Sequence, residues 1–194
     1  MKIGAVLLAA GASTRMGAPK QLIRLDGLSM LRRAAEAAMG SGASPIVVVL
    51  GAHAEQMQPE LVDLPVAAVV NAEWAAGMST SLRLGIQTLL ALAPDTEAAL
   101  VTLCDQPFVT GARLAGLIAG FRAPITASHY NGTLGVPAVF HCSLFGELES
   151  LEGDAGARRL IQRHVAETTE FDLPEAAIDL DTPIDLNSFS AKLH

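Results

Sequence analysis

The chain has 194 residues, of which 51% are hydrophobic, and it carries a formal net charge of −7. Such a hydrophobic fraction excludes a disordered chain, and the negative charge argues against binding to nucleic acid or to an anionic membrane surface. The apolar runs are far shorter than the roughly 18 residues of a membrane span. We therefore expect one globular domain over residues 1–194, with no membrane or nucleic-acid partner.

Basic residues are concentrated near the N-terminus. Residues 1–33 contain six basic residues and one acidic residue, whereas the rest of the chain contains seven and nineteen. This distribution predicts a local anionic ligand, although Arg32 and Arg33 are expected only to solvate a helix face. Two cysteines, Cys104 and Cys142, are too few for a disulfide framework, which favours reduced thiols in a cytoplasmic protein.

Apolar runs and breaker residues predict strands and helices in alternation. A buried strand over 2–9 comes first, followed by the polar loop Gly11–Lys20 and by a helix over 30–40 that Ser29 caps. Further strands are predicted at 45–50, 66–70, 98–103, 125–128, 136–141 and 165–170, and further helices at 77–92, 110–121, 143–151, 155–164 and after Pro183.

This alternation indicates βαβ units. It predicts a single-domain, three-layer α/β/α architecture, with a mostly parallel twisted sheet and helices on both faces, in the manner of a Rossmann-like fold. Ligands of such sheets bind outside the carboxyl ends of the strands. The candidate functional loops are therefore those at 9–20, 71–81, 104–107 and 179–183.

The loop after the first strand is suited to phosphate. Small residues at 9–12 would let a ligand approach the backbone N–H groups, and Arg15 and Lys20 add two cations that match the charge of a triphosphate. The loop is neither a dinucleotide fingerprint nor a P-loop, because it lacks G-x-G-x-x-G and Gly-Lys-Ser/Thr. From these residues alone, an ordinary glycine-containing turn between strand and helix remains the alternative.

Two aspartates are candidate metal ligands. Asp105 follows a predicted buried strand, and Asp181 precedes the last predicted helix. Carboxylates at such positions can share Mg²⁺ with phosphate oxygens, because this cation prefers few protein ligands plus phosphates. The alternatives are a turn residue before Pro107 for Asp105 and a helix N-cap before Thr182 for Asp181. Asp179 is the fallback second ligand, since a shift of two residues along an extended segment keeps the same face.

Four segments together resemble one family. The run L-A-A-G-x-S-x-R-M-G-x-x-K at Leu8–Lys20 resembles the signature of the molybdenum-cofactor nucleotidyltransferases, a family of NTP transferases. The later segments would be weak alone and gain weight from their order along nearly the whole chain. They are N-x-x-W-x-x-G-x-x-x-S-L at Asn71–Leu82, Asp105–Pro107 and Asp179–Pro183, with Gly132–Pro137 and Gly153–Arg158 resembling the molybdenum cofactor cytidylyltransferase branch.

The resemblance implies the nucleotidyltransferase fold and a magnesium-dependent transfer of CMP from CTP to a phosphorylated acceptor, molybdopterin, with release of pyrophosphate. A molybdoenzyme is the implied protein partner. Because the acceptor phosphate is already ionised at neutral pH, charge neutralisation and positioning suffice without a general base. The resemblance assigns catalysis to Arg15, Lys20 and Asp105, metal binding to Asp105 and Asp181, and nucleotide binding to Leu8, Ala9, Ala10, Gly11, Arg15, Lys20, Gly77, Ser79 and Ser81.

More than one role is possible for the residues expected to contact the base and the acceptor. Alanine at Ala10 resembles the cytidylyltransferase form, where glycine marks the guanylyltransferase form, so CTP is expected. Ser79 and Ser81 are either base and ribose contacts or helix caps, and we expect Trp74 to pack under the loop rather than stack on the base. Arg158 either meets the acceptor phosphate or pairs with a nearby carboxylate.

Other functions remain open from the sequence. Transfer from GTP to molybdopterin, or from CTP to a sugar or polyol phosphate, would use the same groups. A non-catalytic chaperone that delivers the cofactor would not need Arg15, Lys20, Asp105 and Asp181, which are all present. An oxidoreductase of the Rossmann type would need the glycine fingerprint that the chain lacks.

Overall fold

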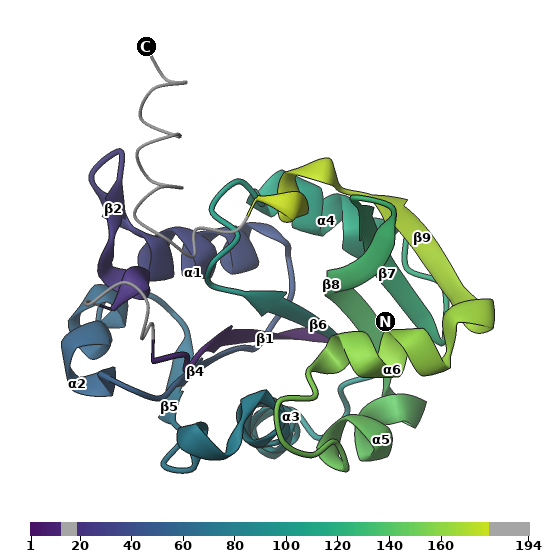
Figure 1. Cartoon of the computed structure of the whole chain (residues 1–194), viewed down its shortest axis with the longest axis horizontal. Coiled ribbons are helices and arrows are strands. Elements are labelled where there is room, and N and C mark those ends of the chain that lie inside the picture. The colour runs from purple at the N-terminus through teal and green to yellow at the C-terminus, as the bar shows by residue number, and fades with distance from the viewer. Residues whose placement is uncertain (13–18, 179–194) are drawn as a thin grey trace.

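The computed structural model describes residues 1–12 and 19–178, and within them one sheet of seven strands forms the centre of the molecule (Figure 1). The strand order is β5-β4-β1-β6-β8-β7-β9. Pairing is parallel throughout, except where β8 meets its two neighbours. The strands are β1 Ile3–Ala9, β4 Ile46–Leu50, β5 Ala67–Val70, β6 Ala98–Leu103, β7 Ile125–Tyr130, β8 Thr133–His141 and β9 Thr168–Asp172.

Helices cover both faces of this sheet (Figure 1). α1 and α4 pack together on one face, and α3, α5 and α6 lie on the other. The expected three-layer, mostly parallel α/β architecture is thereby confirmed. The helices are α1 Met30–Gly40, α3 Met78–Leu92, α4 Gly111–Ala119, α5 Phe145–Glu149 and α6 Ala157–Arg163, with the single turn α2 Ala54–Met57 after β4.

The central strand β1 serves two cores because successive side chains point to opposite faces of a sheet. Leu7 packs in the cluster that contains Leu31 of α1, whereas Val6 packs in the cluster that contains Leu82 of α3. All five residues of β4 are buried. Burial on both faces explains why the central strands read as unbroken apolar runs rather than as an alternating pattern.

The direction of β8 follows from a short turn. Asn131 and Gly132 join β7 to β8 with φ angles of 49° and 68°, a left-handed pair that is typical of a two-residue hairpin. A turn of this length reverses the chain, so β8 runs antiparallel between β7 and β6. The strand begins at Thr133, three residues before the predicted start.

Local signals set several element boundaries correctly. The Ser29 side chain accepts a hydrogen bond from the Arg32 N–H at the start of α1, and Thr110 does the same for Arg113 at the start of α4. The helix predicted over 143–151 is confined to Phe145–Glu149 after a 3₁₀ turn, and the strand predicted from 165 begins at 168. The helix predicted after Pro183 lies outside the described residues.

One small feature was not predicted. β2 Arg24–Leu25 and β3 Leu28–Ser29 form a hairpin around Asp26 and Gly27, whose φ angles of 52° and 83° again fit a two-residue turn.

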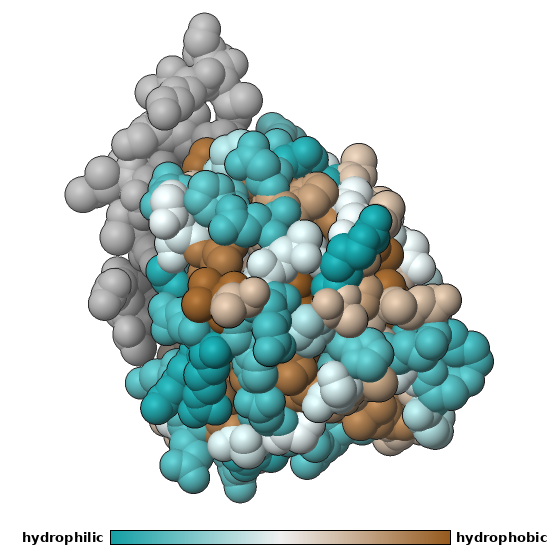
Figure 2. All heavy atoms as spheres, turned by 90° about the vertical axis from the view of Figure 1, so that its right-hand side faces the viewer, coloured by the Kyte–Doolittle hydropathy of each residue, from teal (hydrophilic) through white to brown (hydrophobic). Residues whose placement is uncertain are grey.

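At the far edge of the sheet, β9 carries exposed acidic residues. Figure 2 shows hydrophilic side chains interspersed with small hydrophobic areas on this side of the molecule. Charges on an edge strand discourage pairing with another chain.

No helix in the described part of the chain is long and apolar enough to cross a bilayer.

Candidate active site

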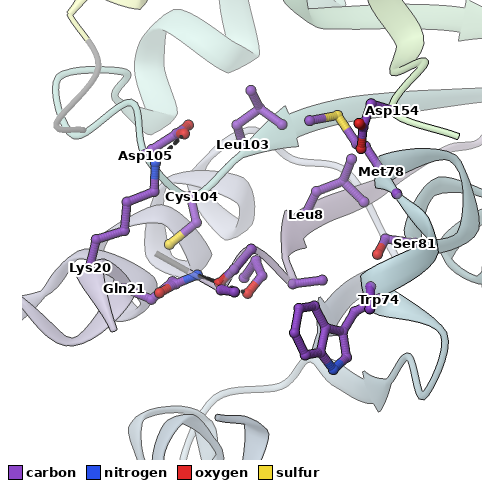
Figure 3. Close-up of a pocket in the computed structure, with 16 residues that line it drawn as sticks. Leu8, Lys20, Gln21, Trp74, Met78, Ser81, Leu103, Cys104, Asp105 and Asp154 are labelled. Carbon is purple, nitrogen blue, oxygen red and sulfur yellow. Dashed lines mark hydrogen bonds and ion pairs between the residues drawn. The ribbon is translucent and has the colours of Figure 1, made fainter. Parts of the chain in front are cut away.

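The carboxyl ends of β1 and β6 open into a cavity of about 370 Å³ (Figure 3). The two strands are paired in register up to Leu8 and Leu103, and the N–H of Cys104 donates to the Leu8 carbonyl just beyond them. The residues that follow each strand therefore lie side by side, as expected for a parallel sheet. The lining comes from segments 8–12, 20–21, 74–81 and 103–105, with Asp154 from the C-terminal half.

One end of the cavity is charged. The Lys20 Nζ donates to Asp105 Oδ2 at 2.8 Å, and both side chains are largely buried, with exposed fractions of 16% and 24%. The other carboxylate oxygen, Asp105 Oδ1, is buried and has no hydrogen-bond partner among the described residues. A buried carboxylate oxygen is costly to leave unsatisfied, so this atom is available for a further ligand.

This oxygen fits a hard divalent cation. Carboxylate oxygen is the donor that Mg²⁺ prefers, and Mg²⁺ usually takes one or two carboxylates plus phosphate and water. Within residues 1–12 and 19–178, no group of three His, Cys, Asp or Glu side chains could hold a metal alone. The remaining ligands of a cation at Asp105 would therefore come from substrate, water or residues beyond these ranges. Arg15, Asp179 and Asp181 lie outside the described residues.

Gln21 is a site residue that the sequence analysis missed. It is buried beside Lys20, and its Nε2 donates to the Ala9 and Gly11 carbonyls at 3.3 and 2.7 Å. These bonds tie the small-residue loop to the 3₁₀ turn Lys20–Leu22 that carries the lysine. An amide side chain following Lys20 carries no local signal of this role, since its partners lie ten and twelve residues away.

The opposite end of the cavity is mostly apolar and carries Trp74, together with the charged Asp154 (Figure 3). A Cβ on Gly51 would lie 2.6 Å from the Ala10 carbonyl and 2.8 Å from the Trp74 Cβ, so only glycine lets these two residues close in over the end of β4. We expected Trp74 to pack under the loop, which is wrong. Its side chain lies on the cavity wall, and the residue is 38% exposed.

The two serines at the start of α3 differ in position. Ser81 lines the cavity, whereas Ser79 does not, and the Ser79 Oγ is buried without a partner among the described residues. Residues two apart on a helix point about 200° away from each other, a signal that could have separated them. Neither serine caps α3, because within the described chain Gly77 occupies the N-cap position with no side-chain cap bond.

A loop from the C-terminal half completes the wall. Gly77 has a φ of 114°, and a Cβ there would lie 2.3 Å from the Gly153 carbonyl carbon, so the two backbones are in contact. The Ser79 N–H donates to the Gly153 carbonyl, which places Asp154 on the cavity. Arg158 instead donates to the Thr133 Oγ1 at 2.8 Å, away from the cavity. An ion pair of Arg158 with a nearby carboxylate is absent among the described contacts, and its contact with the acceptor phosphate stays a prediction.

Cys104 lies between the two ends of the cavity and also belongs to the hydrophobic core (Figure 3). Burial and the neighbouring Asp105 carboxylate raise the pKa of its thiol above the usual value. The side chain is therefore a neutral thiol at physiological pH.

A parallel sheet whose central strands end in a small-residue loop, a lysine and an aspartate around one cavity is the architecture of a nucleotide-handling enzyme. The chain belongs to the family of MobA-like NTP transferase domains, whose model matches residues 5–168. It is thus a nucleotidyltransferase of this family, and the resemblance found in the motifs is confirmed at that level.

Relatives cover most of the chain. Nicotine blue oxidoreductase of Paenarthrobacter nicotinovorans is 33% identical over 168 residues, which is 81% of this chain and 80% of that protein. The purine catabolism protein PucB of Bacillus subtilis (strain 168) is 27% identical over 81% of this chain and 79% of its own length. The structure of Rv0371c from Mycobacterium tuberculosis H37Rv in complex with manganese is 27% identical, with a TM-score of 0.81 over 97% of both chains.

Proposed function

We propose that the protein transfers CMP from CTP to a phosphorylated acceptor, molybdopterin, and releases pyrophosphate. The observation that carries this proposal is the division of the cavity. Lys20 and Asp105 form a charged end, and Trp74, Ala10 and Ser81 form a mostly apolar end across from it (Figure 3). A triphosphate joined to a base by a ribose has the same division of charge.

The charged end would hold the triphosphate. Lys20, Arg15 and backbone N–H groups of the loop that follows β1, such as that of Gly11, offset the negative charge that builds up during transfer. An oxygen of the acceptor phosphate attacks the α-phosphorus in line, and the bond from that phosphorus to the bridging oxygen breaks. The electron pair leaves with pyrophosphate. No proton has to be removed from the attacking phosphate, so the cavity needs no general base.

Mg²⁺ would be held by Asp105 through its unpartnered Oδ1, with Asp181 as second ligand and Asp179 as the fallback. When bound, the cation would neutralise phosphate charge. A hydrogen bond next to Asp105 supports the proposal that Asp181 is the second metal ligand. The Gln106 Nε2, next to Asp105, donates to the Ala176 carbonyl at 3.0 Å. Asp181 lies five positions after Ala176, a distance of at most about 18 Å for an extended chain.

The apolar end would hold the base. Ala10 lines the cavity, its methyl group lies close to Gly51, and we propose that this methyl group narrows the space for a ring. A pyrimidine needs less room than a purine, which favours CTP. Ser81 and the glycine backbone at Gly77 are the contacts proposed for the base and the ribose, whereas Ser79 is not among the residues that line the cavity, which argues against direct contact by that side chain.

One observation favours GTP as a second candidate. Asp154 lies on the cavity at the same end as Met78 and Ser81 (Figure 3). A carboxylate accepts two parallel hydrogen bonds, and the guanine edge offers two adjacent N–H donors where cytosine offers one amino group. Asp154 could equally accept from the two ribose hydroxyls. The choice between CTP and GTP therefore depends on which effect is larger: the narrowing of the cavity by Ala10, which favours CTP, or hydrogen bonding to Asp154, which favours GTP.

The test is an assay of the purified protein with Mg²⁺, molybdopterin and each of the four NTPs in turn, followed by pyrophosphate release. CTP is expected to give the highest kcat/KM. A preference for GTP would identify a guanylyltransferase, and turnover only with sugar or polyol phosphates would replace the acceptor. Nucleotide or molybdopterin binding without turnover would identify a delivery chaperone. Oxidation of NADH is followed in parallel, because one relative is named an oxidoreductase.

We further propose that residues 1–194 act as one nucleotidyltransferase domain in the cytoplasm and hand their product to a molybdoenzyme. A pull-down of the purified chain with a molybdoenzyme, with and without CTP, tests the partner.

A further inference from the structure

Asn71 has no role in the chemistry described above, yet it is buried directly behind the base end of the cavity. Its exposed fraction is 4%, and it is not one of the lining residues. The Asn71 Oδ1 accepts a hydrogen bond from the Glu73 backbone N–H at 2.9 Å. A backbone N–H is only a donor, so this bond fixes which end of the amide is oxygen.

The amide nitrogen therefore points at two hydroxyl groups. The Asn71 Nδ2 donates to the Thr80 Oγ1 at 2.8 Å and to the Ser81 Oγ at 2.9 Å. The Thr80 hydroxyl donates to the Gly77 carbonyl at 2.8 Å, with the Glu73 carbonyl as a second acceptor at 3.1 Å. Its hydrogen bonding is thus complete within the protein.

Ser81 is in a different position. Its Oγ accepts from Asn71, but the described residues offer no acceptor for its own hydroxyl proton. The side chain is 97% buried and lies on the cavity wall, near Leu8 and Trp74 (Figure 3). A buried hydroxyl proton without an acceptor costs free energy, which a ligand acceptor in the cavity would recover.

We propose that Asn71 is a positioning residue that holds the Ser81 hydroxyl as a hydrogen-bond donor, and that Ser81 donates to an acceptor atom of the nucleotide base. This rests on the proposed function only in that a base occupies this end of the cavity. The chemical class recognised is a ring nitrogen or carbonyl oxygen, as on the O2–N3 edge of cytosine. A ligand N–H at the same place would leave the Ser81 proton unpaired, so the site selects against it.

Removal of the donor gives the first measurement. Ser81→Ala is expected to raise the Kd of CTP about three- to tenfold, the usual range for one neutral hydrogen bond. Binding is followed by calorimetry and by the fluorescence of Trp74, which is the single tryptophan of the chain and lines the cavity. Thr80→Ala is the matched control, since it removes the other hydroxyl of the same network. It is expected to lower Tm and to leave the Kd unchanged.

Reversal of the polarity gives the second measurement. In Asn71→Asp the side chain keeps its shape but only accepts, so Ser81 must turn its proton away from the cavity. The Kd of CTP is expected to rise about tenfold or more, with kcat at saturating CTP nearly unchanged. In the Ser81→Ala background, the same Asn71→Asp substitution is expected to change the Kd less than twofold, because the group it acts through is absent.

Two results would overturn the proposal. Equal Kd values for wild type and Ser81→Ala would exclude the donor, and fully additive effects of the two substitutions would make Asn71 a structural residue only. All four NTPs are titrated against the wild type first. A preference for GTP would contradict the proposed function, and the Ser81 comparison would then be made with GTP, so the two failures are distinguishable.

Discussion

Lys20 and Asp105 are 85 positions apart in sequence and form a buried ion pair at the charged end of the cavity. Lys20→Ala is expected to lower kcat/KM for the nucleotide about 100-fold or more, because it removes the cation that we propose offsets the charge of the transferring phosphate. Pyrophosphate release measures this. Lys2→Ala is the control, since Lys2 is exposed and pairs with Asp95 on the surface. An unchanged kcat/KM in Lys20→Ala would remove this lysine from the mechanism.

Asp105→Asn tests the metal ligand. The amide keeps the size of the side chain but loses the charge and is a poor ligand for Mg²⁺, so most activity is expected to disappear while the fold remains. The apparent affinity for Mg²⁺, measured through the change in Tm with added cation, is expected to fall. Asp181→Asn is expected to act in the same direction with a smaller loss. The same Mg²⁺ affinity in wild type and Asp105→Asn would contradict the assignment.

Ala10→Gly tests base selection. The substitution removes the methyl group of a residue that lines the cavity, and on the proposed function this opens room for a purine. Pocket changes of one methyl group are worth about 1–3 kcal/mol of selectivity, so the CTP:GTP ratio of kcat/KM is expected to shift roughly ten- to a hundredfold towards GTP. Both nucleotides are compared with one acceptor. An unaltered ratio would assign base selection to Ser81 and Asp154 instead.

At the scale of the elements, the contact between the start of α3 and the loop at 153–156 holds one wall of the cavity in place. Gly77→Ala places a Cβ 2.3 Å from the Gly153 carbonyl, at a φ that L-residues rarely adopt. We expect a loss of about 1–3 kcal/mol of unfolding free energy and a weaker affinity for nucleotide, because the loop that carries Asp154 must move. Chemical denaturation and calorimetry measure these two quantities.

The matched control lies in α5. Gly146 has an ordinary backbone conformation and no atom within 4 Å of the Cβ position, so Gly146→Ala is expected to leave stability unchanged or slightly raised. The same loss of stability in both variants would mean that the α3–loop contact does not hold the cavity wall.

At the scale of the whole molecule, the reactivity of the two cysteines measures how well the native protein is packed. Cys142 is exposed, whereas Cys104 is buried and has a pKa above the usual value for a thiol. A raised pKa lowers the thiolate fraction at pH 8, so one thiol is expected to react quickly with Ellman's reagent in the native protein. The second is expected to react only after unfolding. Cys142→Ser is expected to abolish the fast phase, and two thiols of equal rate in the native protein would contradict the packing.

Local interactions explain why so much could be predicted from the sequence. Ser29 and Thr110 cap helices through atoms three residues away, and the runs in β1, β4 and β6 are apolar because both faces of the sheet are covered. Because the ends of β1 and β6 could be predicted, the positions of the loop after β1 and of Asp105 after β6 could be predicted too. Capping, burial and strand alternation are short-range in sequence, so the residues themselves determine the α/β class and the edge of the sheet where ligands bind.

Only the tertiary structure decided how the cavity is completed. The bonds of Gln21 to Ala9 and Gly11, the approach of Asp154 to the start of α3, and the exposure of Trp74 over Gly51 depend on packing between segments. The Asn71 amide then sets which way the Ser81 hydroxyl is used. Such contacts have no periodic signature, because their free energy comes from neighbours that only the folded chain brings together.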